Sequence, residues 1–283
     1  MIAVTGATGH LGRLTLDALL DRGVPADELV AAVRDTDKAA DLAARGVHVR
    51  LADYDRPDTL AAAFAGVDKV LLISSDAVGR RVGQHRNVID AAVAAGVALL
   101  AYTSVVRADT SQMVLAADHR ETEVLVRASG VPFSLLRNSW YLENYTGQLP
   151  QYLEHGAILG SADDGRVSAA TRADFAAAAA AVLVGEGHEN SVYELGGDKA
   201  FTLPELAAAI SERAGRDIVY RDLPVEEYAQ VLVGAGLPEP VATMLADSDA
   251  GIARGDLFVD SGDLSRLIGR PATRYTDAVA AAA

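Results

Sequence analysis

Short apolar runs alternate with amphipathic stretches along the first half of the chain. The apolar runs are rich in Val, Ile, Leu and Ala, and they predict buried strands at 2–5, 29–33, 47–52, 70–73, 98–103 and 133–136. The stretches between them predict a helix that begins near Leu11 and further helices at 37–44, 58–64, 84–95 and 119–128. Right-handed crossovers between such strands build a doubly wound parallel sheet, so we expect an α/β fold.

The pattern changes near Trp140. Beyond it, we expect helices at 174–184, 224–236 and 240–246 and strands at 192–195 and 218–220. The run Thr202-Leu203-Pro204-Glu205 is a capping box with proline in the first turn, which predicts a helix start. We expect residues 1–150 to form a large domain to which 173–198 return, and residues 151–172 and 199–283 to form a smaller α/β C-terminal domain.

Glycines with a spacing of three follow the first predicted strand. They stand in the run Gly6-Ala7-Thr8-Gly9-His10-Leu11-Gly12, between a strand and a helix. In a Rossmann-like sheet this context indicates dinucleotide binding, because the first glycine allows a tight turn, the second lets the backbone approach a pyrophosphate and the third lets the helix pack closely. A tight turn without a ligand is the alternative, which the strand-turn-helix context disfavours.

Composition excludes several classes of function. The chain of 283 residues has no cysteine, which excludes disulfides and thiolate chemistry, and its six histidines are scattered, so we expect no metal. A net charge of −14 argues against nucleic acid. We find no membrane span and no signal peptide in the sequence, so we expect a cytoplasmic protein. The sequence is compatible with a homodimer and does not fix the oligomeric state.

Arg34 directly follows the second predicted strand, where a Rossmann-like fold meets the adenosine ribose. An arginine there pairs with a 2′-phosphate and favours NADP over NAD, whereas the alternative is a solvated side chain. Asp53, after the third strand, either contacts the adenine or caps the next turn. Ser74 and Ser75, with Thr103 and Ser104, end two further strands at the edge where ligands bind, although each alone is more often a turn residue.

The proton relay of many short-chain dehydrogenases is missing. That relay is a tyrosine with a lysine four residues later, which lowers the pKa of the phenol. The lysines are Lys38, Lys69 and Lys199, and the residues four positions before them are Arg34, Ala65 and Leu195. The sequence therefore leaves cofactor binding alone, or hydride transfer to an acceptor that takes its proton from water.

Two further features admit both a chemical and a structural interpretation. His119, at the predicted start of a helix, either faces the cofactor or only favours its helix start. Trp140 and Tyr141, with Tyr145 nearby, either stack on a flat ring or cover the domain junction.

Several longer motifs carry a resemblance to one family of proteins. They are the glycine turn, Val78-Gly79-Arg80-Arg81-Val82-Gly83-Gln84-His85-Arg86-Asn87-Val88-Ile89, Ala101-Tyr102-Thr103-Ser104, His119-Arg120-Glu121-Thr122-Glu123, Leu136-Arg137-Asn138-Ser139-Trp140-Tyr141-Leu142-Glu143-Asn144-Tyr145 and Met244-Leu245-Ala246-Asp247-Ser248-Asp249. Together they resemble the NmrA-like, atypical short-chain dehydrogenases, and in particular the bacterial type 2 NAD(P)H:quinone oxidoreductases. The likeness runs essentially from end to end of the chain.

The resemblance implies a Rossmann-like domain, a small C-terminal domain and a cleft between them. It implies NADPH bound by the glycine turn, Arg34, the Ser74-Ser75 edge and 137–141, and direct hydride transfer to a quinone without flavin or metal. His119 stands where related reductases carry lysine but agrees with the quinone-reductase branch, and Ser139 stands where that branch is expected to have glycine. We expect Trp140 and Tyr141 to line the quinone site, and Asn138, Asn144 and His119 to orient the quinone. The rival interpretation is an NADP(H)-binding redox sensor without catalysis; an isomerase or reductase of sugars is disfavoured by the missing tyrosine–lysine pair.

Overall fold

The computed structural model describes residues 1–77 and 79–282, and the chain forms two compact units. Unit 1 comprises Met1–Ser104, Asp118–Arg137 and Arg172–Tyr193. Unit 2 comprises Val105–Ala117, Asn138–Thr171 and Glu194–Ala283. Each unit has its own hydrophobic core.

The predicted sheet is confirmed, with seven strands in the order β3-β2-β1-β4-β5-β6-β8. The strands are β1 (Ile2–Thr5), β2 (Leu29–Val33), β3 (His48–Leu51), β4 (Lys69–Leu72), β5 (Leu99–Val105), β6 (Phe133–Asn138) and β8 (Ser191–Leu195). Ile2 pairs in parallel with Leu29 on one side and with Lys69 on the other. The strand order therefore reverses at β1, and the loops after β1 and β4 leave the sheet at the position where open α/β sheets bind ligands.

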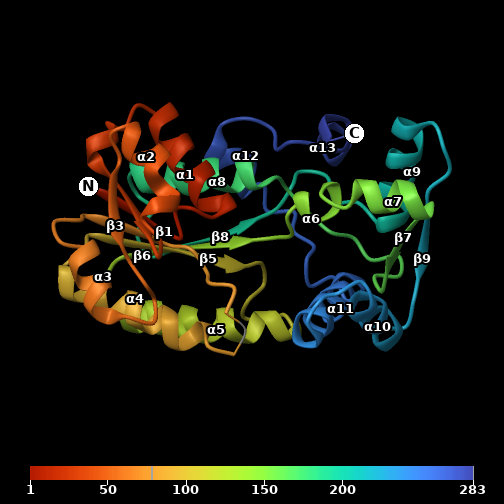
Figure 1. The fold of residues 1–283 in the computed structure, drawn as a ribbon, viewed down its shortest axis with the longest axis horizontal. Coiled ribbons are helices and arrows are strands. Elements are labelled where there is room, and N and C mark those ends of the chain that lie inside the picture. The colour runs from red at the N-terminus through yellow and green to blue at the C-terminus, as the bar shows by residue number, and fades with distance from the viewer. Residues whose placement is uncertain (78, 283) are drawn as a thin grey trace. The chain divides into compact units, whose positions relative to one another are not determined.

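Helices cover both faces of this sheet, as Figure 1 shows, with α1, α2 and α8 on one side and α3, α4 and α5 on the other. Their bounds are α1 (His10–Asp21), α2 (Ala40–Ala44), α3 (Pro57–Ala63), α4 (Arg81–Ala95), α5 (Val114–Ala128) and α8 (Arg172–Val184), with short 3-10 turns η1 (Ala26–Glu28) and η2 (Asp37–Ala39). The alanine-rich α8 packs against α1, because its small side chains allow a close approach. Helix α4 ends at the C-cap Gly96, whose backbone is left-handed, with φ of 68°.

Two helix predictions were wrong in extent. Helix α5 begins at Val114, so His119 lies inside the helix rather than at its start. The carboxylate of Asp247 accepts the backbone N–H of Val114 at 2.7 Å, and this cap comes from a residue remote in sequence. Helix α11 (Glu239–Ala253) continues well beyond the predicted 240–246.

Unit 2 has many short elements, several of which the sequence did not predict. They are α6 (Glu143–Thr146), α7 (Leu149–His155), β7 (Ala157–Gly160), α9 (Leu203–Ala214), β9 (Val219–Asp222), α10 (Val225–Gly234), α11, α12 (Asp263–Ile268) and α13 (Tyr275–Ala282). Strands β7 and β9 pair in parallel, with Ala157 opposite Val219. The capping box of α9 is confirmed, since the Glu205 N–H donates to Thr202 Oγ1 at 3.2 Å and the Thr202 N–H donates to Glu205 Oε2 at 2.8 Å.

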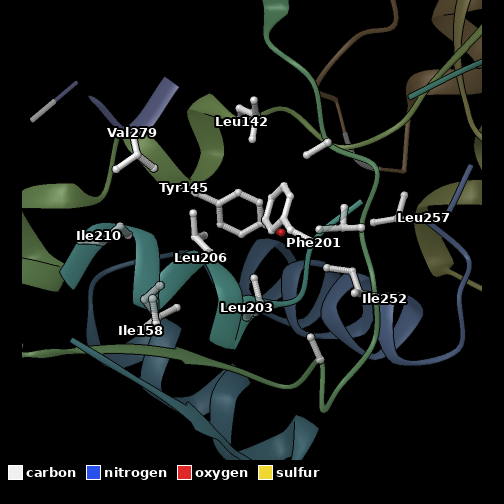
Figure 2. Close-up of a cluster of buried hydrophobic side chains, with 14 of the residues drawn as sticks. Leu142, Tyr145, Ile158, Phe201, Leu203, Leu206, Ile210, Ile252, Leu257 and Val279 are labelled. Atoms are coloured by element: carbon white, nitrogen blue, oxygen red, sulfur yellow. The ribbon is translucent and has the colours of Figure 1, made fainter. Parts of the chain in front are cut away.

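The core of unit 2 is built around aromatic rings. Figure 2 shows Tyr145 beside Phe201, with Leu142, Leu203 and Leu206 around them. The ring centroids of Tyr145 and Phe201 are 6.0 Å apart in an edge-on arrangement. This packing fixes the ring of Tyr145.

Among the described residues, no helix combines the length and the apolar character that crossing a membrane requires.

Candidate functional site

The glycine turn after β1 has the close packing that its sequence predicts. Gly6 has φ of +58°, in the left-handed region that favours glycine, and its carbonyl accepts the N–H of Gly9 at 2.9 Å. A Cβ on Gly12 would lie 2.4 Å from the Gly6 oxygen and 2.7 Å from Ala7 Cα. Ala7 and Leu11, also in the predicted run, are buried and serve packing. Gly12 is therefore required for α1 to start this close to β1.

The N-terminus of α1 borders a cavity of about 600 Å³ within unit 1. No side chain among the described residues caps this helix, and its first turn contains no acid. Its N–H groups and its dipole are therefore available to an anion. The cavity wall continues from Gly6, Thr8 and Gly9 along the ends of the neighbouring strands. This combination of glycine cradle, helix start and adjoining cavity fits a dinucleotide.

Arg34 lies in the wall of this cavity and is exposed. Among the described residues its guanidinium makes no hydrogen bond or ion pair. The other cations of the wall are engaged: Arg13 pairs with Asp41 at 2.6 Å, and Lys38 lies 3.8 Å from Asp35. Arg34 is thus the wall cation that can turn to a phosphate without breaking an existing pair.

The side chain of Asp53 takes part in a local turn. Its Oδ1 accepts the N–H of Asp55 at 3.0 Å, and the wall contains its neighbours Ala52 and Tyr54 instead. The Tyr54 hydroxyl lies 2.9 Å from the Ile73 carbonyl and contacts the Thr5 hydroxyl, and burial raises the pKa of this phenol. Tyr54 therefore joins the loop after β3 to the end of β4, a role that the sequence did not reveal.

Ser74 and Ser75 line the cavity, and helix α4 holds their loop in place. His85 Nε2 accepts the N–H of Ser75 at 3.0 Å, Gln84 Oε1 accepts from Ser75 Oγ at 2.7 Å, and Arg81 Nε donates to the Ser75 carbonyl at 2.7 Å. These contacts give a role to Arg81, Gln84 and His85 of the Val78–Ile89 motif, of which Val78 lies outside the described residues. The motif therefore positions the cavity wall.

His85 must be neutral to make this contact. Its Nε2 accepts from Ser75, so its Nδ1 carries the proton and donates to Thr122 Oγ1 at 2.9 Å, while that hydroxyl donates to the Asp118 carbonyl. Burial, with a smaller contribution from the Arg81 charge, lowers the pKa of His85 to about 3. The ring is consequently a fixed acceptor at neutral pH.

Thr103, Ser104 and Arg137 lie behind the wall rather than in it. Thr103 Oγ1 accepts the Ser74 N–H at 2.9 Å. Ser104 Oγ donates to Glu123 Oε1 at 2.6 Å, and Arg137 grips the same carboxylate through Nε at 2.8 Å and Nη2 at 2.7 Å. Ser104, Glu123 and Arg137 are all buried, so this cluster braces β5, β6 and α5.

His119 is also buried. It lies neither in the wall of the unit 1 cavity nor in the wall of a second cavity, which is within unit 2. Its Nδ1 lies 2.7 Å from the Tyr102 hydroxyl, and burial lowers the pKa of the imidazole well below its ordinary value. The imidazole of His119 is therefore neutral near pH 7, and it shares a hydrogen bond with the Tyr102 hydroxyl. The described residues include no group of three His, Cys, Asp or Glu able to hold a metal.

A second cavity, of about 750 Å³, lies within unit 2. Trp140 and Asn144 are in its wall, as is Tyr145, whereas Tyr141 is not. The backbone of Ala170 holds this segment, since it donates to the Trp140 carbonyl at 3.1 Å and accepts the Leu142 N–H at 2.9 Å. Of the residues predicted for the quinone site, Trp140 and Asn144 therefore share one cavity.

Asn138 and Ser139 are neighbours at the point where β6 ends. Asn138 is buried at the end of β6, and its Oδ1 has no hydrogen-bond partner among the described residues. Such an acceptor is costly unless a ligand or water meets it. Ser139 Oγ donates to the Leu257 carbonyl at 3.0 Å, which gives a structural role to the residue found in place of the expected glycine.

Comparison with known proteins places this chain among dinucleotide-dependent oxidoreductases. The model of the NmrA-like family matches residues 1–258. The chain is 51% identical to quinone oxidoreductase 2 of Escherichia coli over 99% of this chain and 97% of the relative. The crystal structure of an NADPH-dependent quinone oxidoreductase of E. coli complexed with NADPH superposes with a TM-score of 0.97 at 51% identity, covering 99% of both chains. Triphenylmethane reductase of Citrobacter sp., complexed with NADP(H), follows with a TM-score of 0.95 at 41% identity and full coverage of both chains.

Proposed function

We propose a function for this chain from one premise: it belongs to the NmrA-like family. The chain is an oxidoreductase that transfers a hydride from NADPH to a quinone. The observation that carries this conclusion is the 51% identity, over nearly the whole of both chains, to an E. coli quinone oxidoreductase. The unit 1 cavity supports it, because its glycine turn and Arg34 suit a phosphorylated dinucleotide.

The unit 1 cavity binds and orients the cofactor in this proposal. The N-terminus of α1 receives the pyrophosphate, Arg34 pairs with the 2′-phosphate, and Ser74 and Ser75 follow the cofactor along the sheet edge. Thr103 acts through the loop that it supports, Ser104 acts through its buried contact with Glu123, and Asp53 acts through its turn. Bound NADPH supplies two electrons as a hydride, and no flavin or metal is needed for this transfer.

The unit 2 cavity is the proposed quinone site. Trp140 offers an indole ring to a flat substrate, and Asn144 offers an amide that hydrogen-bonds to a quinone oxygen. Tyr141 and Asn138 remain proposed members of the site. The quinolate that forms takes its proton from water, so His119, neutral and bonded to Tyr102, is a positioning group rather than an obligatory acid.

The quinone dependence of NADPH oxidation tests this function. Absorbance of NADPH is followed with the protein alone, with 1,4-benzoquinone alone and with both. An enzyme of the proposed type consumes NADPH rapidly only when both are present. A redox sensor would bind NADPH tightly without quinone-dependent oxidation, and that result would contradict the proposal.

A further inference from the structure

The unit 2 cavity has an apolar part and a polar part. Val231, Leu232 and Leu237, from α10 and the loop that follows it, contribute aliphatic wall, while Leu245 and Asp249 come from α11. The Met244–Asp249 motif therefore serves two purposes: Asp247 caps α5, and Asp249 lines the cavity. This second purpose has no assigned chemistry.

Tyr145 is the first of two unusual polar groups in the wall. Only 6% of the residue is exposed, and its hydroxyl has no hydrogen-bond partner among the described residues. The ring cannot turn away, because Phe201 and the leucines of the unit 2 core hold it. A buried phenol without a partner lowers stability, so its retention calls for a partner from outside the chain.

Asp249 is the second group. It is 8% exposed, and its Oδ2 accepts the N–H of Ser161 at 3.0 Å, while its Oδ1 has no hydrogen-bond partner among the described residues. Burial, together with the nearby charge of Asp222, raises the pKa of this carboxyl to about 7. Part of the population therefore carries a proton near neutral pH, and a protonated carboxyl is a hydrogen-bond donor.

We propose that Tyr145 and Asp249 form the polar end of the unit 2 cavity and hydrogen-bond to one carbonyl oxygen of a bound quinone. The rest of the ring and its apolar substituents lie against the aliphatic wall. Both groups are donors in their protonated forms, which suits a ligand whose oxygens only accept. The identification of the ligand as a quinone rests on the proposed function, whereas the polar end is argued from the cavity alone.

The chain carries its own probe for this site. Trp140 is the only tryptophan and lines the cavity, so ligand binding changes the intrinsic fluorescence. The absence of cysteine means that a quinone forms no thiol adduct that would disturb the titration. Free N-acetyltryptophanamide, titrated in parallel, corrects for light absorbed by the ligand.

The test compares 1,4-naphthoquinone with naphthalene, which has the same rings without the oxygens. Tyr145→Phe and Asp249→Ala each remove a donor. Because alanine also removes the acceptor of the Ser161 N–H, the affinity for naphthalene shows whether the cavity itself is preserved. We expect each variant to bind 1,4-naphthoquinone about tenfold more weakly, as the loss of one hydrogen bond implies, and naphthalene as well as the wild type does. Tyr275→Phe, outside the cavity wall, is the matched control and keeps both affinities.

Two readouts separate a binding role from a structural one. Tyr145→Phe should melt at the same temperature as the wild type or higher, because it removes an unpartnered hydroxyl. Unchanged naphthoquinone affinity in both variants, or an equal loss for naphthalene, would overturn the proposal. If NADPH oxidation alone fails, the enzyme function is overturned. The site that recognises the carbonyl oxygens of the ligand is then still supported.

Discussion

Arg34 is the residue on which the proposed choice between NADPH and NADH depends. Its guanidinium is in the cavity wall and has no competing partner among the described residues. Arg34→Ala should weaken NADPH binding by about 1.5–3 kcal/mol more than NADH binding, the value of a hydrogen bond to a charged group. Isothermal titration with both cofactors measures this difference.

Arg56→Ala is the matched control for Arg34. Arg56 is also exposed, pairs with Asp58 at 3.1 Å and is absent from the cavity wall. It should leave both affinities unchanged, because exposed ion pairs contribute little. An equal loss of NADPH and NADH affinity in Arg34→Ala would show that this arginine does not bind the phosphate.

The position of a residue at the end of a predicted strand indicated that it lies near the site. It did not indicate which groups its side chain contacts. Arg34, Ser74 and Ser75 are in the cavity wall, because residues that end parallel strands share one sheet edge. Arg137 also ends a strand, yet Glu123 on α5 engages it. The local sequence did not predict that Asp249 is buried, because its burial depends on how unit 2 packs.

At the scale of elements, α4 acts as the support for the loop after β4. His85 accepts the Ser75 N–H only when neutral, and its pKa of about 3 lies below the ordinary 6.5 of an unfolded histidine. The unfolded chain therefore binds more protons, so this contribution to stability is complete above pH 6.5 and declines as pH falls toward 3. The melting temperature should fall across that interval.

His85→Gln tests the contribution of this histidine. Glutamine places an acceptor where Nε2 stands but does not titrate, so its melting temperature should fall less steeply than that of the wild type between pH 6.5 and 4.5. Differential scanning fluorimetry at several pH values gives both slopes. Parallel slopes would show that His85 does not titrate between the folded and unfolded states.

Elements with a strong local pattern were predictable, whereas those that depend on distant partners were not. Strand β2 has the predicted bounds, because a continuous apolar run between charged residues has few alternatives. The start of α5 was misplaced because its cap, Asp247, is far away in sequence. Strand β7 escaped prediction because it is short and pairs only with β9.

At the scale of the whole molecule, the chain places one cavity in each of its two units. The unit 1 cavity follows from the strand-glycine-helix pattern, which is why the fold class and cofactor type could be predicted. The unit 2 cavity is formed by short helices without a repeating pattern, so its lining could only be seen in three dimensions. The resemblance of the 136–145 motif to quinone reductases predicted that this segment binds the quinone, but it did not predict the shape of the cavity.

The proposed reaction is the transfer of two electrons together from NADPH to a quinone. Its most direct test is the anaerobic stoichiometry of the purified protein, with NADPH consumed and quinol formed measured in the same sample and the absorbance spectrum checked for flavin. We predict one quinol for each NADPH, without a flavin spectrum and without a semiquinone signal in electron paramagnetic resonance. Semiquinone accumulation, a requirement for added flavin, or NADPH left unconsumed would contradict the account.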